Sequence, residues 1–262
     1  MINFFRKIRY DLMEKNKTGK YLKYAIGEII LVVIGILIAL SINNWNEKRN
    51  NLKKGQTILI QLKKEYKSNL LQLDEKILMR SKIVRSCKDI LDIIDNPISL
   101  NQDSLFQKIA TLTLDPTFDP VTNDLISSGN LRLIKNEDLK QKLSNWTSDI
   151  LALQEMELQW QKMTLQINFP FIVRLNIYRD IANVQYKNET VPVFILDKSL
   201  NGKLNIGKSK KTPSLAEVLN NPELESLVTK AITDNYLNNL QSHSLRNKIN
   251  DIINLIDKEI KR

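Results

Sequence analysis

The longest apolar stretch of the chain lies near its N-terminus, where residues 29–40 include no polar side chain. Ten of these twelve residues are Leu, Ile or Val. A helix from Tyr24 to Trp45 would be about 33 Å long, close to the thickness of a bilayer's hydrocarbon core. Its terminal aromatic rings suit the headgroup level. The pattern predicts a transmembrane helix over residues 24–45, preceded by a cytoplasmic basic segment over residues 1–23.

Two alternatives apply to this stretch. The core helix of a soluble protein is disfavoured because residues 29–40 have no polar face. A cleaved signal peptide would use Ala39-Leu40-Ser41 as its cleavage site, but the apolar residues continue to Ile42 and the basic region exceeds twenty residues. A lipoprotein is excluded because the single cysteine, Cys87, lies far beyond the apolar core. We therefore expect an uncleaved signal anchor.

One acidic residue, Glu28, interrupts the apolar segment about one helical turn from its start. Gly27, Gly35 and Ala39 fall on one face of the predicted helix, and small residues four apart allow two helix backbones to approach closely. Two interpretations stay open. Either Glu28 and this face form a helix–helix contact in the membrane, or Glu28 extends to the aqueous boundary and the small residues have no special role.

The chain beyond the apolar segment is patterned as long amphipathic helices. Residues 52–94 carry apolar side chains at steps of three, four and seven, which predicts one helix that continues the span and ends at Asn96-Pro97. A second long helix begins at Asn136, which can cap it. Its apolar steps indicate coiled-coil-like packing, interrupted at Glu157 and Thr164, and Phe169-Pro170 disturbs or ends it.

Shorter elements complete the pattern. We expect a short helix around residues 104–114 and another that Thr122 caps and Gly129 ends in the left-handed conformation. Residues 171–212 are the least regular part, where Asn201-Gly202 favours a small β-hairpin or a loop about equally. Asn221 caps a final long helix with Pro222 in its first turn. The prediction is an all-α fold, with an extracytoplasmic helical bundle over residues 46–262.

Charge adds an orientation to this picture. The formal net charge is +10, and basic residues are more numerous before the span than just after it, seven against four. This bias places the N-terminus in the cytoplasm and the C-terminal domain on the other side of the membrane. The remaining charges alternate in sign along the helices, which is typical of solvated faces. We expect contact with a lipid bilayer and no nucleic-acid partner.

The opening of the chain resembles a known family. The stretches "MINFFRKIR", "YAIGEIILVVIGILIAL" and "INNWNE" are similar to the start of an uncharacterised single-span family widespread in Bacteroidota. A looser match follows over residues 125–143, and Ser41 stands where the family has glutamine. The resemblance implies a bacterial inner-membrane protein with a periplasmic domain. It implies no activity and no site residues, because the family has no known function.

The residues that carry chemistry form no motif that we can assign. His243 is the single histidine, so a metal site or proton relay that needs two histidines cannot form. Cys87 lies on the apolar face of its predicted helix, where a buried thiol is usual. We expect no nucleotide-binding glycine loop, no cofactor and no metal, and the aspartates near Pro116 and Pro120 are explained by capping of turns. The prediction is that the protein is not an enzyme.

Two classes of function fit these features. The first is a membrane-anchored helical interaction or scaffold protein, which forms a homo-oligomer or binds a membrane protein partner. The second is an extracytoplasmic ligand-sensing or transport-accessory module that acts through a partner protein. The second class ranks lower because a sensor usually has a cytoplasmic output domain, and here the cytoplasmic segment is about two dozen residues long.

Overall fold

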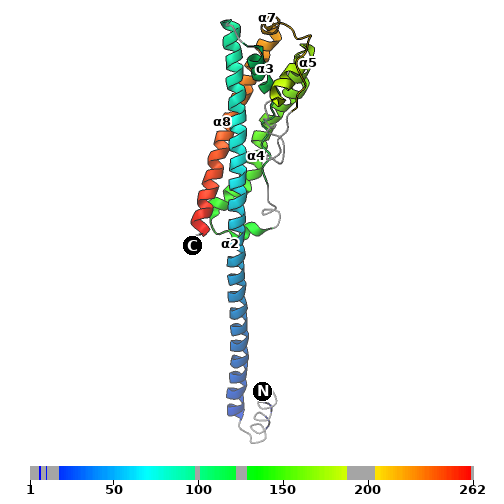
Figure 1. Cartoon of the computed structure of the whole chain (residues 1–262). Helices are drawn as coiled ribbons and strands as arrows, with labels where there is room; N and C mark the ends of the chain where they lie inside the picture. The colour runs from blue at the N-terminus through cyan, green and yellow to red at the C-terminus, as the bar shows by residue number, and fades with distance from the viewer. Residues whose placement is uncertain are drawn as a thin grey trace. The chain divides into compact units, whose positions relative to one another are not determined.

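The computed structural model describes residues 18–97, 101–121, 129–187 and 204–260, together with Arg6 and Tyr10. Within these residues the chain is helical and has no strand (Figure 1), so the predicted all-α fold is confirmed. The hairpin considered at Asn201-Gly202 lies outside the described residues. So does the short helix expected before Gly129, although Gly129 itself has the predicted left-handed conformation, with φ of 69°.

The chain divides into two compact units, Met1–Ile58 and Leu59–Arg262. The first unit contains the beginning of α2, a helix with the bounds Thr18–Asp95. This helix is long and apolar enough to cross a membrane, and no part of its most apolar window is buried in the structure. Near the end of that window the Arg49 guanidinium lies over the Trp45 ring, 5.7 Å from its centroid. The predicted apolar helix is therefore present, with its apolar surface uncovered.

The second unit is built on three long helices: the remainder of α2, α4 (Glu137–Met163) and α8 (Pro222–Ile260). Two ion pairs show that α8 is antiparallel to α2. Lys63 pairs with Asp257 at 2.5 Å, and Asp74 pairs with Arg246 at 2.6 Å. As the residue number rises along α2, the partner's number falls along α8. The end of α2 at Asp95, just before Asn96-Pro97, agrees with the prediction.

The third long helix, α4, is parallel to α2. The rings of Tyr66 and Trp146 lie 4.9 Å apart, and further along both helices Arg80 pairs with Glu157. The α4 helix begins as predicted, because the Asn136 side chain accepts a hydrogen bond of 2.9 Å from the Leu139 amide. An equivalent cap begins α8, where the Asn221 side chain accepts from the amide of the second helical residue. The capping side chains thus define where two of the long helices start.

A proline disturbs α4 without ending the helix. The residues Thr164–Asn168 form a π-helical segment, and α5 (Phe169–Arg174) continues directly from it. Pro170 has no amide hydrogen, and its ring would collide with the carbonyl group one turn earlier in an ordinary α-helix. The wider π-helical turn just before it accommodates the ring. The sequence predicted that Phe169-Pro170 either disturbs or ends this helix, and the structure shows that it disturbs the helix without ending it.

Short helices pack at the end of the second unit where α2 ends. Residues 171–212 were expected to be the least regular part of the chain. Their first half contains most of α5 and all of α6, so this part is more helical than predicted. The α6 helix has only nine residues, which is too short for a clear apolar period. These short elements are α3 (Gln102–Ala110), η1 (Thr111–Thr113), α6 (Tyr178–Tyr186) and α7 (Leu215–Leu219). The short helix η2 (Asn130–Leu133) lies at the other end, just before α4 and close to the end of α8. The main apolar core joins α2, α3, α4, α5, α6 and α8.

Candidate functional site

The residues predicted to form a membrane helix contact all lie on α2 in the first unit. Gly27 and Glu28 are partly exposed, and Gly35 and Ala39 are exposed. A Cβ atom added at either glycine would meet no other atom within 4 Å. No described atom of the chain therefore covers the two glycines of the small-residue face. Whether another helix covers this face remains a prediction.

A second group of functional interest lies in the interior of the bundle. Arg80 of α2 and Glu157 of α4 form an ion pair, with 0% and 3% of their side chains exposed. Charged side chains are almost never fully buried unless they are paired. Arg80 follows Leu73 and Ile77 at steps of four and three on the apolar face of its helix. The Arg80 side chain therefore lies in the core because its position in the helix period is that of a buried residue.

The ion pair connects four parts of the second unit. Arg80 donates one hydrogen bond to the Ser242 hydroxyl on α8, at 2.6 Å, and another to the Pro116 carbonyl, at 2.8 Å. The second carboxylate oxygen of Glu157 accepts a hydrogen bond of 3.0 Å from the Phe118 amide. The cluster therefore binds α2, α4 and α8 to the segment that precedes α4.

That segment, residues 112–121, contacts both α2 and α4 and has no regular secondary structure after η1 ends at Thr113. Buried backbone groups need hydrogen-bond partners, and a segment outside helices and sheets has no regular backbone partners. Side chains do so instead. Asn69 of α2 donates to the carbonyl of Val121 and accepts from its amide, both at 2.9 Å. From α4, the Trp160 indole donates to the Leu114 carbonyl at 2.9 Å.

Burial controls the electrostatics of the cluster. It raises the pKa of Glu157 to about 7, because the ionised form is poorly solvated in the core. The Arg80 charge and the Phe118 amide act in the opposite direction, and the nearby Asp115 carboxylate acts in the same direction as burial. Burial also lowers the pKa of Arg80, although Glu157 opposes this. The cluster therefore holds a carboxyl group whose protonation changes near neutral pH.

The residues weighed for catalysis are not brought together. Cys87 is fully buried, and burial raises the pKa of its thiol to about 12. His243 is exposed on α8, and the two side chains form no contact that would activate the thiol. Asp115 accepts hydrogen bonds from the side chains of Thr117 and Gln161, so the backbone capping predicted for it stays a prediction. Among the described residues, no group of three or more His, Cys, Asp or Glu side chains is placed to hold a metal ion.

One sequence pattern was overlooked and needs correction. Residues 202–209 read G-K-L-N-I-G-K-S, which satisfies the letters of a phosphate-binding Walker loop. In such a loop the backbone amides and the start of a following helix hold phosphate. Here the Ser209 amide donates to the Asp180 carboxylate at 3.0 Å, Lys208 pairs with Asp103, and α7 begins only at Leu215. A carboxylate thus takes the place that phosphate would need.

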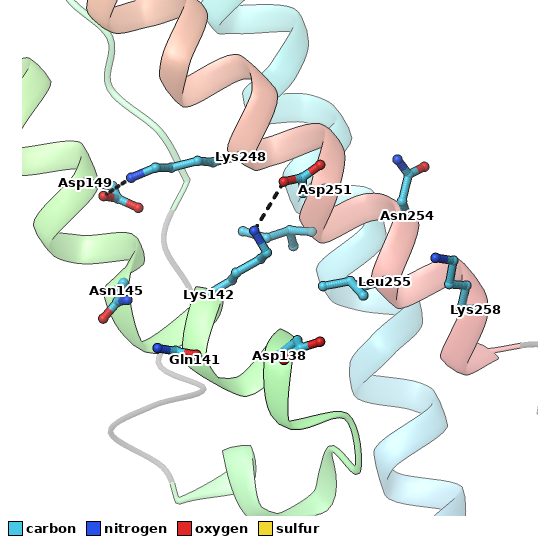
Figure 2. Close-up of a pocket in the computed structure, with 11 residues that line it drawn as sticks. Asp138, Gln141, Lys142, Asn145, Asp149, Lys248, Asp251, Asn254, Leu255 and Lys258 are labelled. Carbon is cyan, nitrogen blue, oxygen red and sulfur yellow. Dashed lines mark hydrogen bonds and ion pairs between the residues drawn. The ribbon is translucent and has the colours of Figure 1, made fainter.

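A polar groove lies between the start of α4 and the end of α8 (Figure 2). Its volume is about 510 Å³. Two ion pairs cross it, Lys142 with Asp251 at 3.2 Å and Lys248 with Asp149 at 2.5 Å. The lining includes three aspartates and three lysines, so its charges cancel. The groove has no excess charge with which to attract an ionic ligand.

The sequence contained a signal for the buried pair that we did not use. Glu157 was noted as an interruption of the apolar steps of its helix, but Arg80, which interrupts the equivalent steps on α2, was passed over. Two charges of opposite sign on the apolar faces of two helices that share a core are expected to pair, because an unpaired buried charge is very costly. The segment 112–121 carried no such signal.

Comparison with known proteins supplies one match. A family of unknown function (DUF6090) matches residues 28–151 of the chain. The matched region includes α2 from Glu28 onward, α3, the segment 112–121 and the first half of α4, so it contains Arg80 but not Glu157. This agrees with the resemblance to an uncharacterised family. No curated protein and no solved structure matches the chain.

Proposed function

We propose that the protein is a membrane-anchored interaction protein, in which α2 anchors the chain and the helical domain presents a surface to a partner. One observation carries the anchor: all the large apolar side chains between Ile26 and Ile42 are exposed, on every side of the helix. Keeping one such side chain in water rather than burying it costs roughly 1.5–3 kcal/mol. A bilayer removes this cost for the whole helix at once.

The setting that fits this role best is a bacterial inner membrane. The N-terminus would lie in the cytoplasm and the domain from residue 46 onward in the periplasm. The basic residues before the apolar helix support this orientation. The Trp45 ring with Arg49 above it supports a membrane–water boundary near this position, because such amphipathic groups prefer the headgroup region. The resemblance to a bacterial single-span family supports the choice of membrane.

An interaction role also accounts for the chemistry of the domain better than catalysis does. Its buried charges bind its own helices and the segment 112–121, and its polar groove is electrically balanced by its own ion pairs. We therefore propose that the protein is not an enzyme. A ligand sensor remains the second candidate, but the groove offers little support for it, because a bound ion would have to compete with Lys142, Asp251 and their neighbours.

Anchoring is tested by fractionation of cells that produce the full chain with a C-terminal tag. The chain should stay in the membrane fraction during alkaline extraction, and its N-terminus should be that of the uncleaved chain. Recovery of a soluble protein that begins near Ile42 would show that the apolar segment is a cleaved signal, and the anchor would be rejected.

Orientation is tested with a thiol reagent that cannot cross membranes. In a Cys87→Ala background, an Asn247→Cys variant should be labelled in intact spheroplasts, because Asn247 is exposed on α8. A matched Lys23→Cys variant, which precedes the apolar stretch, should be labelled only after lysis. The reverse pattern would place the helical domain in the cytoplasm.

A further inference from the structure

A row of exposed leucines lies along the outward face of α4 and reaches the π-helical segment Thr164–Asn168 that continues it. Leu151, Leu158 and Leu165 are 53%, 46% and 63% exposed. They are spaced seven residues apart, so they lie on one side of the helix over a length of about 21 Å. Single exposed leucines are ordinary, but a regular row on one helix face is the pattern of a helix–helix interface.

The charges between these leucines are few and have a regular arrangement. From Leu151 to Leu165 the helix has three charged residues, and one of them, Glu157, is buried in the core. The other two, Glu155 and Lys162, are exposed and form no ion pair with any residue that the structure describes. One lies on each side of Leu158, at nearly equal distances along the helix.

This arrangement is complementary to itself when one helix is reversed. In an antiparallel pair centred on Leu158, Leu151 meets Leu165 of the second copy, and Glu155 meets Lys162 of the second copy. Both contacts occur twice, as a two-fold axis requires. A parallel pair would instead place each of these charges beside its own equivalent, which is repulsive.

We propose that the outward face formed by Leu151, Glu155, Leu158 and Lys162 of α4, together with Leu165 of the π-helical segment that follows, is the interface between two copies of this chain, with their α4 helices antiparallel. The proposal rests on the proposed interaction role and names the surface and the partner. It uses no residue of the apolar segment in α2, so it can fail or succeed independently of the anchor.

Cysteine cross-linking tests the geometry, using the full chain purified in mild detergent with Cys87→Ala. Leu158→Cys should give a disulfide-linked dimer under mild oxidation, because residue 158 lies on the two-fold axis. Leu151→Cys and Leu165→Cys should each give little dimer alone, but a mixture of the two, carrying different tags, should give the mixed dimer.

Leu71→Cys, an exposed leucine of α2, is the control for random collision. Dimers from Leu151→Cys alone, or equal yields from Leu158→Cys and Leu71→Cys, would overturn the proposal.

A charge exchange tests the complementarity. In the Leu158→Cys background, Glu155→Lys should lower the yield of linked dimer by about threefold to tenfold, since two weak attractions become repulsions. The double variant Glu155→Lys/Lys162→Glu should restore it, because the reversed charges again match. Lys82→Glu, on an exposed face of α2, should change nothing. Loss in both the single and the double variant would mean that the face does not bind a second copy, and the proposal would be wrong.

The two proposals remain distinguishable in these experiments. A chain that stays in the membrane but forms no Leu158→Cys dimer supports the anchor and rejects the α4 interface. A soluble chain that forms the predicted set of dimers rejects the anchor and supports the interface.

Discussion

Arg80 on α2 and Glu157 on α4 form an ion pair in the interior of the bundle, with 0% and 3% of their side chains exposed. The same two side chains also bind Ser242 on α8 and the backbone of the segment 112–121. An apolar core alone would permit helices to slide relative to one another, whereas a buried polar cluster is satisfied in one arrangement. We infer that the cluster helps to define the register of the three long helices.

Breaking the pair from one side should be more damaging than removing it completely. Glu157→Met is expected to lower the free energy of unfolding by about 3–5 kcal/mol, because Arg80 is left as an uncompensated buried charge. Arg80→Met/Glu157→Met should cost less than the sum of the two single changes. Urea unfolding followed by circular dichroism, on the full chain in detergent, measures all three.

The exposed pair Lys248 with Asp149 supplies the matched control for this cycle. Its coupling energy should be below about 1 kcal/mol, as for other surface ion pairs. Equal coupling energies for the two pairs would show that burial adds nothing to the Arg80–Glu157 interaction.

The pH dependence of stability should report Glu157. Burial raises the pKa of this group from 4.5 to about 7, so the folded chain binds the proton more tightly than the unfolded chain. The resulting stabilisation is fully present below about pH 4.5 and is lost as the pH rises through about 7. Measured relative to Glu157→Gln, the free energy of unfolding should therefore fall between pH 5 and pH 8. A rise over this range would show that the attraction of Arg80 outweighs burial.

The segment 112–121 should depend on Asn69, whose side chain makes two hydrogen bonds to Val121. Asn69→Leu leaves both backbone groups without this partner and should cost about 1–2 kcal/mol, because Val121 is 58% exposed and water replaces part of the lost bonding. Asn69→Asp keeps the acceptor for the amide but loses the donor to the carbonyl, and should also be destabilising. Gln61→Leu, at an exposed position of the same helix, is the control. Hydrogen exchange should show faster exchange at the Val121 amide in Asn69→Leu, and unchanged protection there would contradict the role given to Asn69.

The open face of the apolar segment provides a test of the membrane contact. A Cβ atom added at Gly35 meets no atom within 4 Å, so Gly35→Ile causes no collision of the new Cβ with the chain itself. The variant should reduce self-association in a membrane assay, and Glu28→Leu should reduce it more than Glu28→Gln, because an amide still forms hydrogen bonds. Val33→Leu, on the other side of the helix, should have little effect. Equal association of all four variants would mean that Glu28 only reaches the aqueous boundary.

Local signals were sufficient for most of the helices. Asn136 and Asn221 begin long helices because their side chains satisfy amides that the helix itself leaves free, and this depends only on the neighbouring residues. The short α6 helix was not expected, because nine residues contain too few turns to show an apolar period. Pro170 shows a limit of such local signals. Its disturbance of the helix was predictable, but the π-helical segment Thr164–Asn168 through which the helix continues was not.

By itself, the sequence determined that this chain is helical, that residues 29–40 are apolar on every side, and that Glu157 interrupts an otherwise apolar face. These properties follow from the order of neighbouring residues and from the helix period. Only the tertiary structure decided that Arg80 is the partner of Glu157 and that Asn69 holds the segment 112–121. The reason is that these contacts join residues 52 to 77 positions apart, and their existence depends on which helix faces meet in the folded bundle.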